Sequence, residues 1–239
     1  MNRFFTTDIL QNGTARISGD DVKHITKVLR LRAGDEVEIC DERGKECEAK
    51  IVSIMPSFVI LKTGEWKQSN AEPEHKVTLF QCIPKAGKME TIIQKCVELG
   101  IMRIIPVQSA RCVALPKGDF ERRLERYQRV SLEASKQSKR GFVPQIKKPE
   151  LLETLDLGGF DTVIVAYEGE KEASLKSVLR GREVGGRIAI IVGPEGGFEP
   201  SEIDTLSQKG AIPVTLGNRI LRTETAGMAI LAQVMYEVE

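Results

Sequence analysis

The sequence predicts an α/β protein with a mostly parallel sheet flanked by helices, preceded by a small β-rich domain. Three observations support this fold class. After residue 70, apolar runs of strand length alternate with stretches of helical periodicity. Before it, short apolar runs are separated by turn signals. Between the two regions, residues 69–74 are polar and contain Pro73. We therefore expect domains at residues 1–70 and 71–239.

In the first domain, we expect strands at residues 37–40, 47–54 and 58–63, with a turn at 41–45. Asp20 or Asp21 is expected to cap a short helix that ends at Leu29. This pattern is typical of a small β-barrel-like domain with one helix.

In the second domain, strands are expected at residues 77–83, 101–107, 162–167, 188–192 and 212–216. Helices are expected at residues 88–99, 119–139, 173–179, 201–209 and 223–237, with Asp119 as the cap of the second helix. The final helix is apolar on most sides, which predicts burial in the domain or at a dimer interface.

Composition excludes several classes of protein. With 239 residues, 41% of them hydrophobic and 29% charged, the chain is long enough for a sizeable core. No apolar run approaches the roughly 20 residues of a membrane span. The first residues lack the apolar segment of a secretory signal, so we expect a cytoplasmic protein. Five cysteines without CxxC spacing indicate reduced thiols, and no metal site is expected.

Charge is segregated along the chain although the net charge is only +1. Residues 111–150 hold 11 basic and 5 acidic residues, whereas residues 151–239 hold 8 and 14. Such a local basic patch can bind a phosphate backbone. By charge alone, however, a solvated helix face is the favoured interpretation.

The most informative feature is a pair of glycine-containing turns, each following an apolar run. Residues 193–198 read Gly-Pro-Glu-Gly-Gly-Phe, and residues 217–226 read Gly-Asn-Arg-Ile-Leu-Arg-Thr-Glu-Thr-Ala. Glycine lets backbone groups approach a flat ligand closely. One such turn would merely end a strand, but two in series, on strands expected to be neighbours, favour a ligand pocket.

Glu195 limits the chemistry of that ligand. The first turn lacks the GxxxxGK[ST] pattern, no GxGxxG opens a helix, and a carboxylate within the turn would repel phosphate. A phosphate-binding nucleotide enzyme is therefore the least supported alternative. S-adenosylmethionine has no phosphate and carries a sulfonium cation, so it suits this turn.

These motifs closely resemble those of the RsmE family, which are 16S ribosomal RNA uridine-N3 methyltransferases of the SPOUT superfamily. The resemblance extends to residues 24–35 and 133–144 and so covers nearly the whole chain. It implies a PUA-like N-terminal domain and a C-terminal domain with a deep trefoil knot. It also implies a homodimer that binds S-adenosylmethionine in the knot and methylates N3 of one uridine in 16S rRNA of the small subunit.

The residues expected to bind the cofactor lie at the ends of three strands and in the two turns. They are Ala166, Tyr167, Glu168, Val192, Gly193, Glu195, Gly196, Gly197, Leu216, Gly217, Ile220, Leu221, Thr225 and Ala226.

Three residues are catalytic candidates. Uracil N3 must lose its proton before it attacks, and a guanidinium stabilises the negative charge that develops. We favour Arg222 over Arg219 because it precedes the last helix, although an ion pair with Glu224 or Glu195 is an equal alternative. Glu224 is most simply a carboxylate favoured by the helix dipole. The general base is left open between Glu195, an unassigned group and water.

RNA contacts are expected in two basic regions. The candidate residues are His24, Lys27, Arg30, Arg32, Arg111, Lys136, Gln137 and Arg140. The aromatic content of 5% argues against recognition dominated by base stacking. Two alternatives stay open: a SPOUT methyltransferase of another RNA, and a non-catalytic ribosome-assembly protein.

Overall fold

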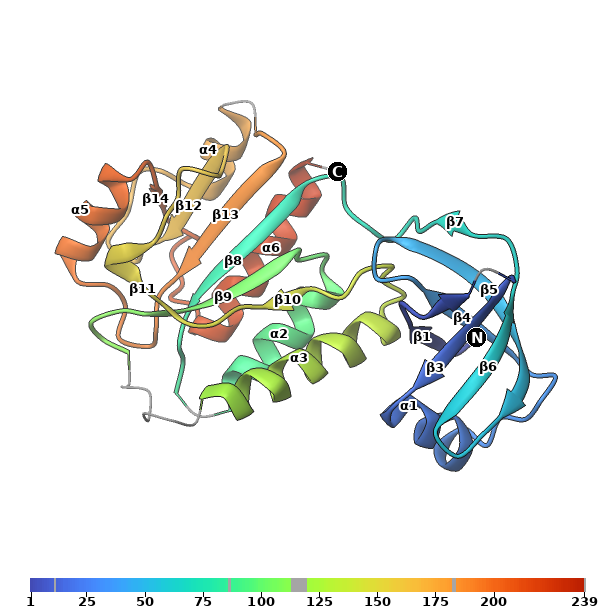
Figure 1. The fold of residues 1–239 in the computed structure, drawn as a ribbon. Helices are drawn as coiled ribbons and strands as arrows, with labels where there is room; N and C mark the ends of the chain where they lie inside the picture. The colour runs from blue at the N-terminus through green and yellow to red at the C-terminus, as the bar shows by residue number, and fades with distance from the viewer. Residues whose placement is uncertain (11, 86, 113–119, 182–183, 239) are drawn as a thin grey trace. The chain divides into compact units, whose positions relative to one another are not determined.

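The computed structural model describes residues 1–10, 12–85, 87–112, 120–181 and 184–238 (Figure 1). By its internal contacts the chain forms two compact units. The first comprises Met1–Glu72 with Ser135–Val143, and the second Pro73–Ala134 with Pro144–Glu239. None of the helices in the described ranges combines the length and apolar content that a bilayer span requires.

The first unit is built on a curled sheet of seven strands in the order β1-β4-β5-β6-β3-β2, with β7 paired to β5 (Figure 1). The strands are β1 (Arg3–Phe5), β2 (Ile9–Leu10), β3 (Thr14–Ser18), β4 (Glu36–Cys40), β5 (Lys45–Ile54), β6 (Phe58–Thr63) and β7 (Lys67–Gln68). The expected strands correspond to β4, β5 and β6. Alternate residues of β3 and β5 are buried, which places one face of the sheet on the core.

The helix of this unit differs from the expected one. It consists of α1 (Asp20–Lys23) continued by a π-helix (His24–Val28). The prediction that Asp20 or Asp21 caps it is wrong, because both lie in its first turn and Gly19 is the N-cap. Gly19 adopts a φ of 75°, a conformation that favours glycine over aspartate.

Residues 135–143 belong to the first unit through buried arginines. The Arg3 guanidinium donates to the carbonyl oxygens of Lys139 and Arg140 at 2.6 and 2.7 Å. Arg140 in turn forms an ion pair with Glu72 at 2.6 Å, and its side chain is only 3% exposed. Long-range contacts of this kind cannot be inferred from the local sequence pattern.

The second unit contains a parallel sheet in the order β10-β9-β8-β13-β12-β14, with β11 paired to β9. Its strands are β8 (Lys76–Cys82), β9 (Arg103–Gln108), β10 (Gln145–Ile146), β11 (Glu150–Leu151), β12 (Thr162–Ala166), β13 (Arg187–Val192) and β14 (Ile212–Val214). The predicted parallel α/β architecture is confirmed.

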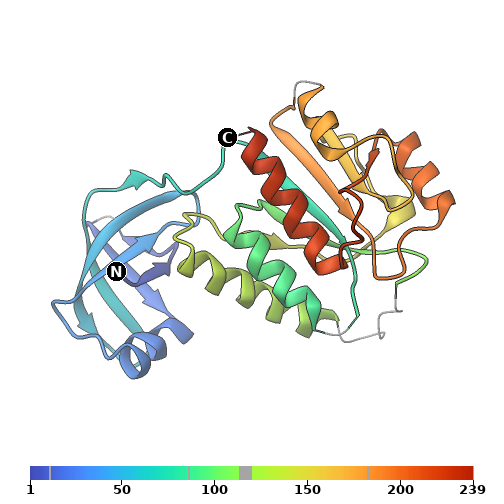
Figure 2. The ribbon, with the colours of Figure 1, turned by 180° about the vertical axis from the view of Figure 1, so that it is seen from behind.

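Helices cover both faces of this sheet (Figures 1 and 2). The helices are α2 (Lys88–Glu98), α3 (Phe120–Gln137), α4 (Leu175–Arg180), α5 (Pro200–Gln208) and α6 (Thr223–Val238). Residues of α2, α3, α4 and α6 pack on one face, while α5 and the 3₁₀ turn Leu152–Thr154 pack on the other. The expected cap Asp119 lies outside the described residues.

The strand order corrects one expectation. The strands that precede the two glycine turns, β13 and β14, are not neighbours, because β12 lies between them. Ala166 at the end of β12 is in register with both Val192 and Val214. The carboxyl ends of three adjacent parallel strands therefore meet at one edge, which is where open α/β sheets bind ligands.

Candidate active site

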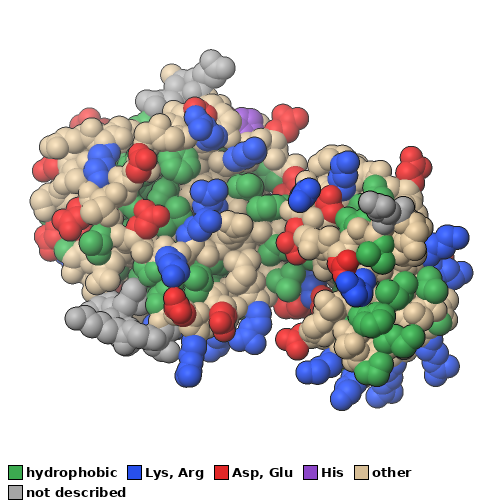
Figure 3. Space-filling model, in the orientation of Figure 1, with side chains coloured by type: hydrophobic (Ala, Val, Ile, Leu, Met, Phe, Trp, Pro, Cys, Tyr) green, Lys and Arg blue, Asp and Glu red, His purple; other side chains and the backbone are tan. Residues whose placement is uncertain are grey.

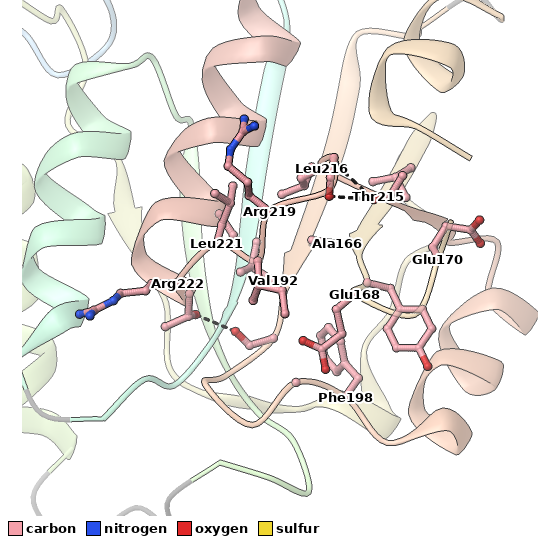
Figure 4. A pocket seen from close by; sticks show the side chains of 18 of the residues that line it. Ala166, Glu168, Glu170, Val192, Phe198, Thr215, Leu216, Arg219, Leu221 and Arg222 are labelled. Atoms are coloured by element: carbon pink, nitrogen blue, oxygen red, sulfur yellow. Dashed lines mark hydrogen bonds between the residues drawn. The ribbon is translucent and has the colours of Figure 1, made fainter. Parts of the chain in front are cut away.

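A cavity of about 680 Å³ opens at the carboxyl ends of β12, β13 and β14 (Figure 4). Backbone and side chains of the first loop (residues 193–198) and the second loop (residues 215–222) form much of its wall. Val192, Leu216 and Leu221 supply apolar surface. Its size and mixed lining are typical of a site for a small organic ligand.

The first loop is held in shape by glycine. Gly197 has a φ of 67°, and its N–H donates to the Pro194 carbonyl at 3.0 Å. A Cβ atom at this position would lie 2.7 Å from Glu168 Oε1. The loop and the Glu168 carboxylate thus approach each other closely because residue 197 has no side chain.

Arg111 supports the first loop from outside the cavity. Its guanidinium donates to the Gly196 carbonyl at 2.7 Å and pairs with Glu199 at 2.8 Å. Glu199 and Glu202 form the capping box of α5. Arg111 therefore has a structural role in this unit besides the RNA contact expected from the sequence.

The two loops are joined by a buried hydrogen-bond chain. The Thr223 hydroxyl donates to the Gly193 carbonyl at 2.6 Å. Gln81, which is fully buried on β8, donates from Nε2 to Thr223 Oγ1 at 2.9 Å. The chain links the start of α6 to the end of β13 and thereby fixes the cavity wall.

A second link between the loops is made by Lys88, at the first position of α2. Lys88 Nζ lies 2.9 Å from Glu195 Oε1 and 3.1 Å from Glu224 Oε2. Burial alone would raise the pKa of Glu195, but the Lys88 ammonium and the Lys85 backbone N–H hold that pKa below its usual value. The Glu224 pKa is lowered by a backbone N–H and by Lys88, and the two carboxylates raise the Lys88 pKa.

The two arginines of the second loop are exposed and line the cavity. Among the described residues, neither Arg219 nor Arg222 forms an ion pair, and Lys88 instead occupies the carboxylates considered as partners of Arg222. Figure 4 shows both arginines extending away from Glu168 and Glu170, which line the other side. Lys171 lies next to Glu170 in the lining and Glu195 pairs with Lys88, so acidic and basic side chains both occur around the cavity.

Most residues expected at the cofactor line this cavity. They are Ala166, Tyr167, Glu168, Val192, Gly193, Glu195, Gly197, Leu216, Gly217, Ile220, Leu221 and Ala226. Gly196 and Thr225 do not line it, because Gly196 faces Arg111 and Thr225 is on the exposed side of α6. Sequence reasoning missed Lys88, Glu170, Phe198 and Thr223. A lysine at the start of a helix beside two glycine loops carries no recognisable local signal.

Most of the side chains expected to contact RNA are exposed, but two of them are buried in ion pairs within the protein. His24, Lys27, Arg30 and Arg32 are exposed on or just after the helix of the first unit, and Gln137 is exposed too. Figure 3, in the orientation of Figure 1, shows Lys and Arg side chains at the end of the unit where α1 lies. Two expectations need correction: Lys136 is mostly buried against Asp21 at 2.7 Å, and Arg140 is buried against Glu72. These two ion pairs instead join residues 135–143 to the rest of the first unit.

Among the described residues, no group of three His, Cys, Asp or Glu side chains is arranged to hold a metal ion.

Comparison with known proteins shows that the chain resembles RNA methyltransferases along its whole length. Residues 71–235 match the family of RNA methyltransferase domains, and residues 17–63 match the RNA methyltransferase PUA domain. The chain belongs to this RNA methyltransferase family. The family member "Ribosomal RNA small subunit methyltransferase E" of Bacillus subtilis is 32% identical, with 100% of this chain and 98% of the relative covered.

Two similar structures contain S-adenosylmethionine. The Neisseria gonorrhoeae ribosomal RNA small subunit methyltransferase E bound to S-adenosyl methionine has a TM-score of 0.89 at 30% identity, covering 99% of this chain and 97% of the other. A Legionella pneumophila putative methyltransferase with bound cofactor SAM has a TM-score of 0.88 at 27% identity, covering 98% and 96%.

Proposed function

We propose that this chain transfers the methyl group of S-adenosylmethionine to N3 of a uridine in 16S ribosomal RNA of the small subunit. The observation that carries the proposal is the cavity at the ends of β12, β13 and β14, framed by both family motifs. A relative that is 32% identical over the whole chain is a small-subunit rRNA methyltransferase, and two similar structures bind S-adenosylmethionine.

The cavity suits this donor. Gly193, Gly197 and Gly217 leave backbone open to an adenosine, and a Cβ atom on Gly197 would force the Glu168 carboxylate to move. The carboxylates of Glu168 and Glu170 suit a ligand with cationic groups. When bound, S-adenosylmethionine supplies an electrophilic methyl group.

The arginine side of the cavity suits the uridine. We propose that Arg222, assisted by Arg219, donates hydrogen bonds to a uracil oxygen and stabilises the negative charge left when N3 loses its proton. Glu195 and Glu224 are weak bases because Lys88 helps to lower their pKa values. We therefore propose that water accepts the N3 proton of uracil. Glu224 does not accept this proton and contributes only through its negative charge.

The first unit is proposed to act as a PUA-like RNA-binding domain through His24, Lys27, Arg30 and Arg32, and the second as the methyl-transfer domain. The trefoil knot implied by the resemblance remains a prediction. A homodimer acting in the cytoplasm is proposed on the same resemblance. Tyr236 on α6, which is 84% exposed, is a candidate dimer contact.

The test uses small subunits from a strain that lacks this protein. Purified full-length chain is incubated with these subunits and tritiated S-adenosylmethionine, and the RNA is digested to nucleosides. Label in 3-methyluridine of 16S rRNA supports the proposal. Label in another nucleoside or RNA would favour a different methyltransferase, and donor binding without transfer would favour an assembly protein.

A further inference from the structure

We propose that Lys88 is a positioning residue that holds the two cavity loops together by neutralising Glu195 and Glu224. This inference rests on the proposed function, since it concerns the binding of the methyl donor between those loops. It adds a residue of α2 to a site that the two C-terminal motifs alone do not contain.

The geometry places one ammonium between two carboxylates from different segments. Lys88 Nζ is 2.9 Å from Glu195 Oε1 in the first loop and 3.1 Å from Glu224 Oε2 in the first turn of α6, which follows the second loop. The three side chains are only 19–29% exposed, so solvent screens their charges incompletely. Lys88 also lines the cavity itself.

The rest of the local structure makes this ammonium difficult to replace. Glu195 has two backbone contacts to the Lys85 N–H, at 3.1 and 3.2 Å, which fix its position but carry no full charge. Glu224 Oε2 is buried, and Lys88 Nζ at 3.1 Å is its charged partner. Without the ammonium, two carboxylates within a few ångströms would repel each other across the loop junction.

Loss of Lys88 should weaken binding of the methyl donor, because the segments that Lys88 joins border the cavity. Repulsion between Glu195 and Glu224 would separate residues 193–198 from the start of α6, and both border the cavity. The donor would then have to restore the closed arrangement when it binds, which lowers its apparent affinity. Removing one carboxylate along with the lysine would relieve the repulsion.

Calorimetry with S-adenosylmethionine tests this on the full-length chain. We expect Lys88→Met to weaken binding about tenfold, Lys88→Arg to stay within about threefold of the original, and Lys88→Met/Glu195→Gln to recover most of the loss. The matched control is Lys95→Met, which removes a lysine paired with Glu98 on the same helix outside the cavity. This control should bind the donor as the unmodified chain does.

Two results would overturn the proposal: unchanged binding in Lys88→Met, or a double variant that folds yet binds as weakly as the single one. If Lys88→Met does not fold, the comparison of Lys88→Arg with Lys88→Met/Glu195→Gln still decides, because charge neutralisation requires both to bind well. Failure of the unmodified chain to bind S-adenosylmethionine would instead refute the proposed function.

Discussion

The hydroxyl of Thr223 and the carbonyl of Gly193 are joined by a 2.6 Å hydrogen bond. The two residues belong to different sequence motifs, and Gln81 of a third strand completes the chain by donating to the same hydroxyl. The cavity is therefore a product of polar contacts between motifs as well as of the loops themselves.

Replacing Thr223 with valine keeps the shape of the side chain and removes the hydroxyl. We expect a loss of about 1–3 kcal/mol in the free energy of unfolding, because buried partners lose their hydrogen bonds, together with weaker donor binding. Chemical denaturation and calorimetry measure the two effects. Thr223→Ser should retain both properties, and Thr205→Val serves as the control, because the half-buried Thr205 donates only an exposed hydrogen bond within α5. Equal stability of Thr223→Val and the original would contradict the assigned role.

Gly197→Ala tests the close approach of the first loop to Glu168. The new Cβ would lie 2.7 Å from Glu168 Oε1 at a φ of 67°, so we expect donor affinity to fall about tenfold. Gly210→Ala is the matched control, since Gly210 also has a positive φ of 89° but its Cβ would meet nothing within 4 Å. It should lower stability without changing donor affinity. Similar affinities for both variants would argue against the close approach.

Arg222→Ala should separate catalysis from cofactor binding. Because its guanidinium extends away from Glu168 and is expected to meet the uracil, we predict a fall in kcat of about 100-fold with little change in donor affinity. Single-turnover methyl transfer to small subunits gives the rate. Arg187→Ala, at the opposite end of β13, should be active. An Arg222→Ala enzyme with the original rate would remove this arginine from the mechanism.

Cys112 should be the most reactive thiol of the chain. Contact with the Cys82 thiol and with Ser109 lowers its pKa to about 6 despite the opposing effect of burial. Burial raises the pKa of Cys40 and Cys96 to about 12 and of Cys47 to about 11. Iodoacetamide labelling, read by mass spectrometry, should increase with pH around 6 for Cys112 and level off by pH 7. An ordinary thiol would have its midpoint near pH 8.5 and would continue to gain reactivity above it. A midpoint in that higher range would contradict the assignment.

Neutralising Arg140 should lower the stability of the protein, whereas neutralising Lys27 should change only its RNA binding. Arg140→Met leaves Glu72 without its buried partner, so we expect a loss of about 3 kcal/mol of stability. Lys27→Gln removes an exposed charge, which should leave stability unchanged and reduce the salt dependence of RNA binding. Thermal denaturation and filter binding at several salt concentrations distinguish the two. A stable Arg140→Met protein with weakened RNA binding would restore Arg140 as an RNA contact.

The sequence by itself determined the parallel α/β architecture, nearly all of its longer elements and the two loops of the cavity. Apolar periodicity and turn residues are local properties, so the helix at residues 88–99 could be predicted, and its apolar residues Met89, Ile92, Ile93, Cys96 and Val97 are buried in α2. The strands β1, β2 and β7, of two or three residues, gave too little pattern to be recognised, and β3 was missed although its burial alternates.

Only the tertiary structure decided which segments meet. It placed β12 between β13 and β14, paired Lys88 with two distant glutamates, and buried Arg140 against Glu72. Each of these depends on residues brought together from far along the chain. Packing of the whole sheet and its helices sets such contacts, and no local spacing of residue types encodes them.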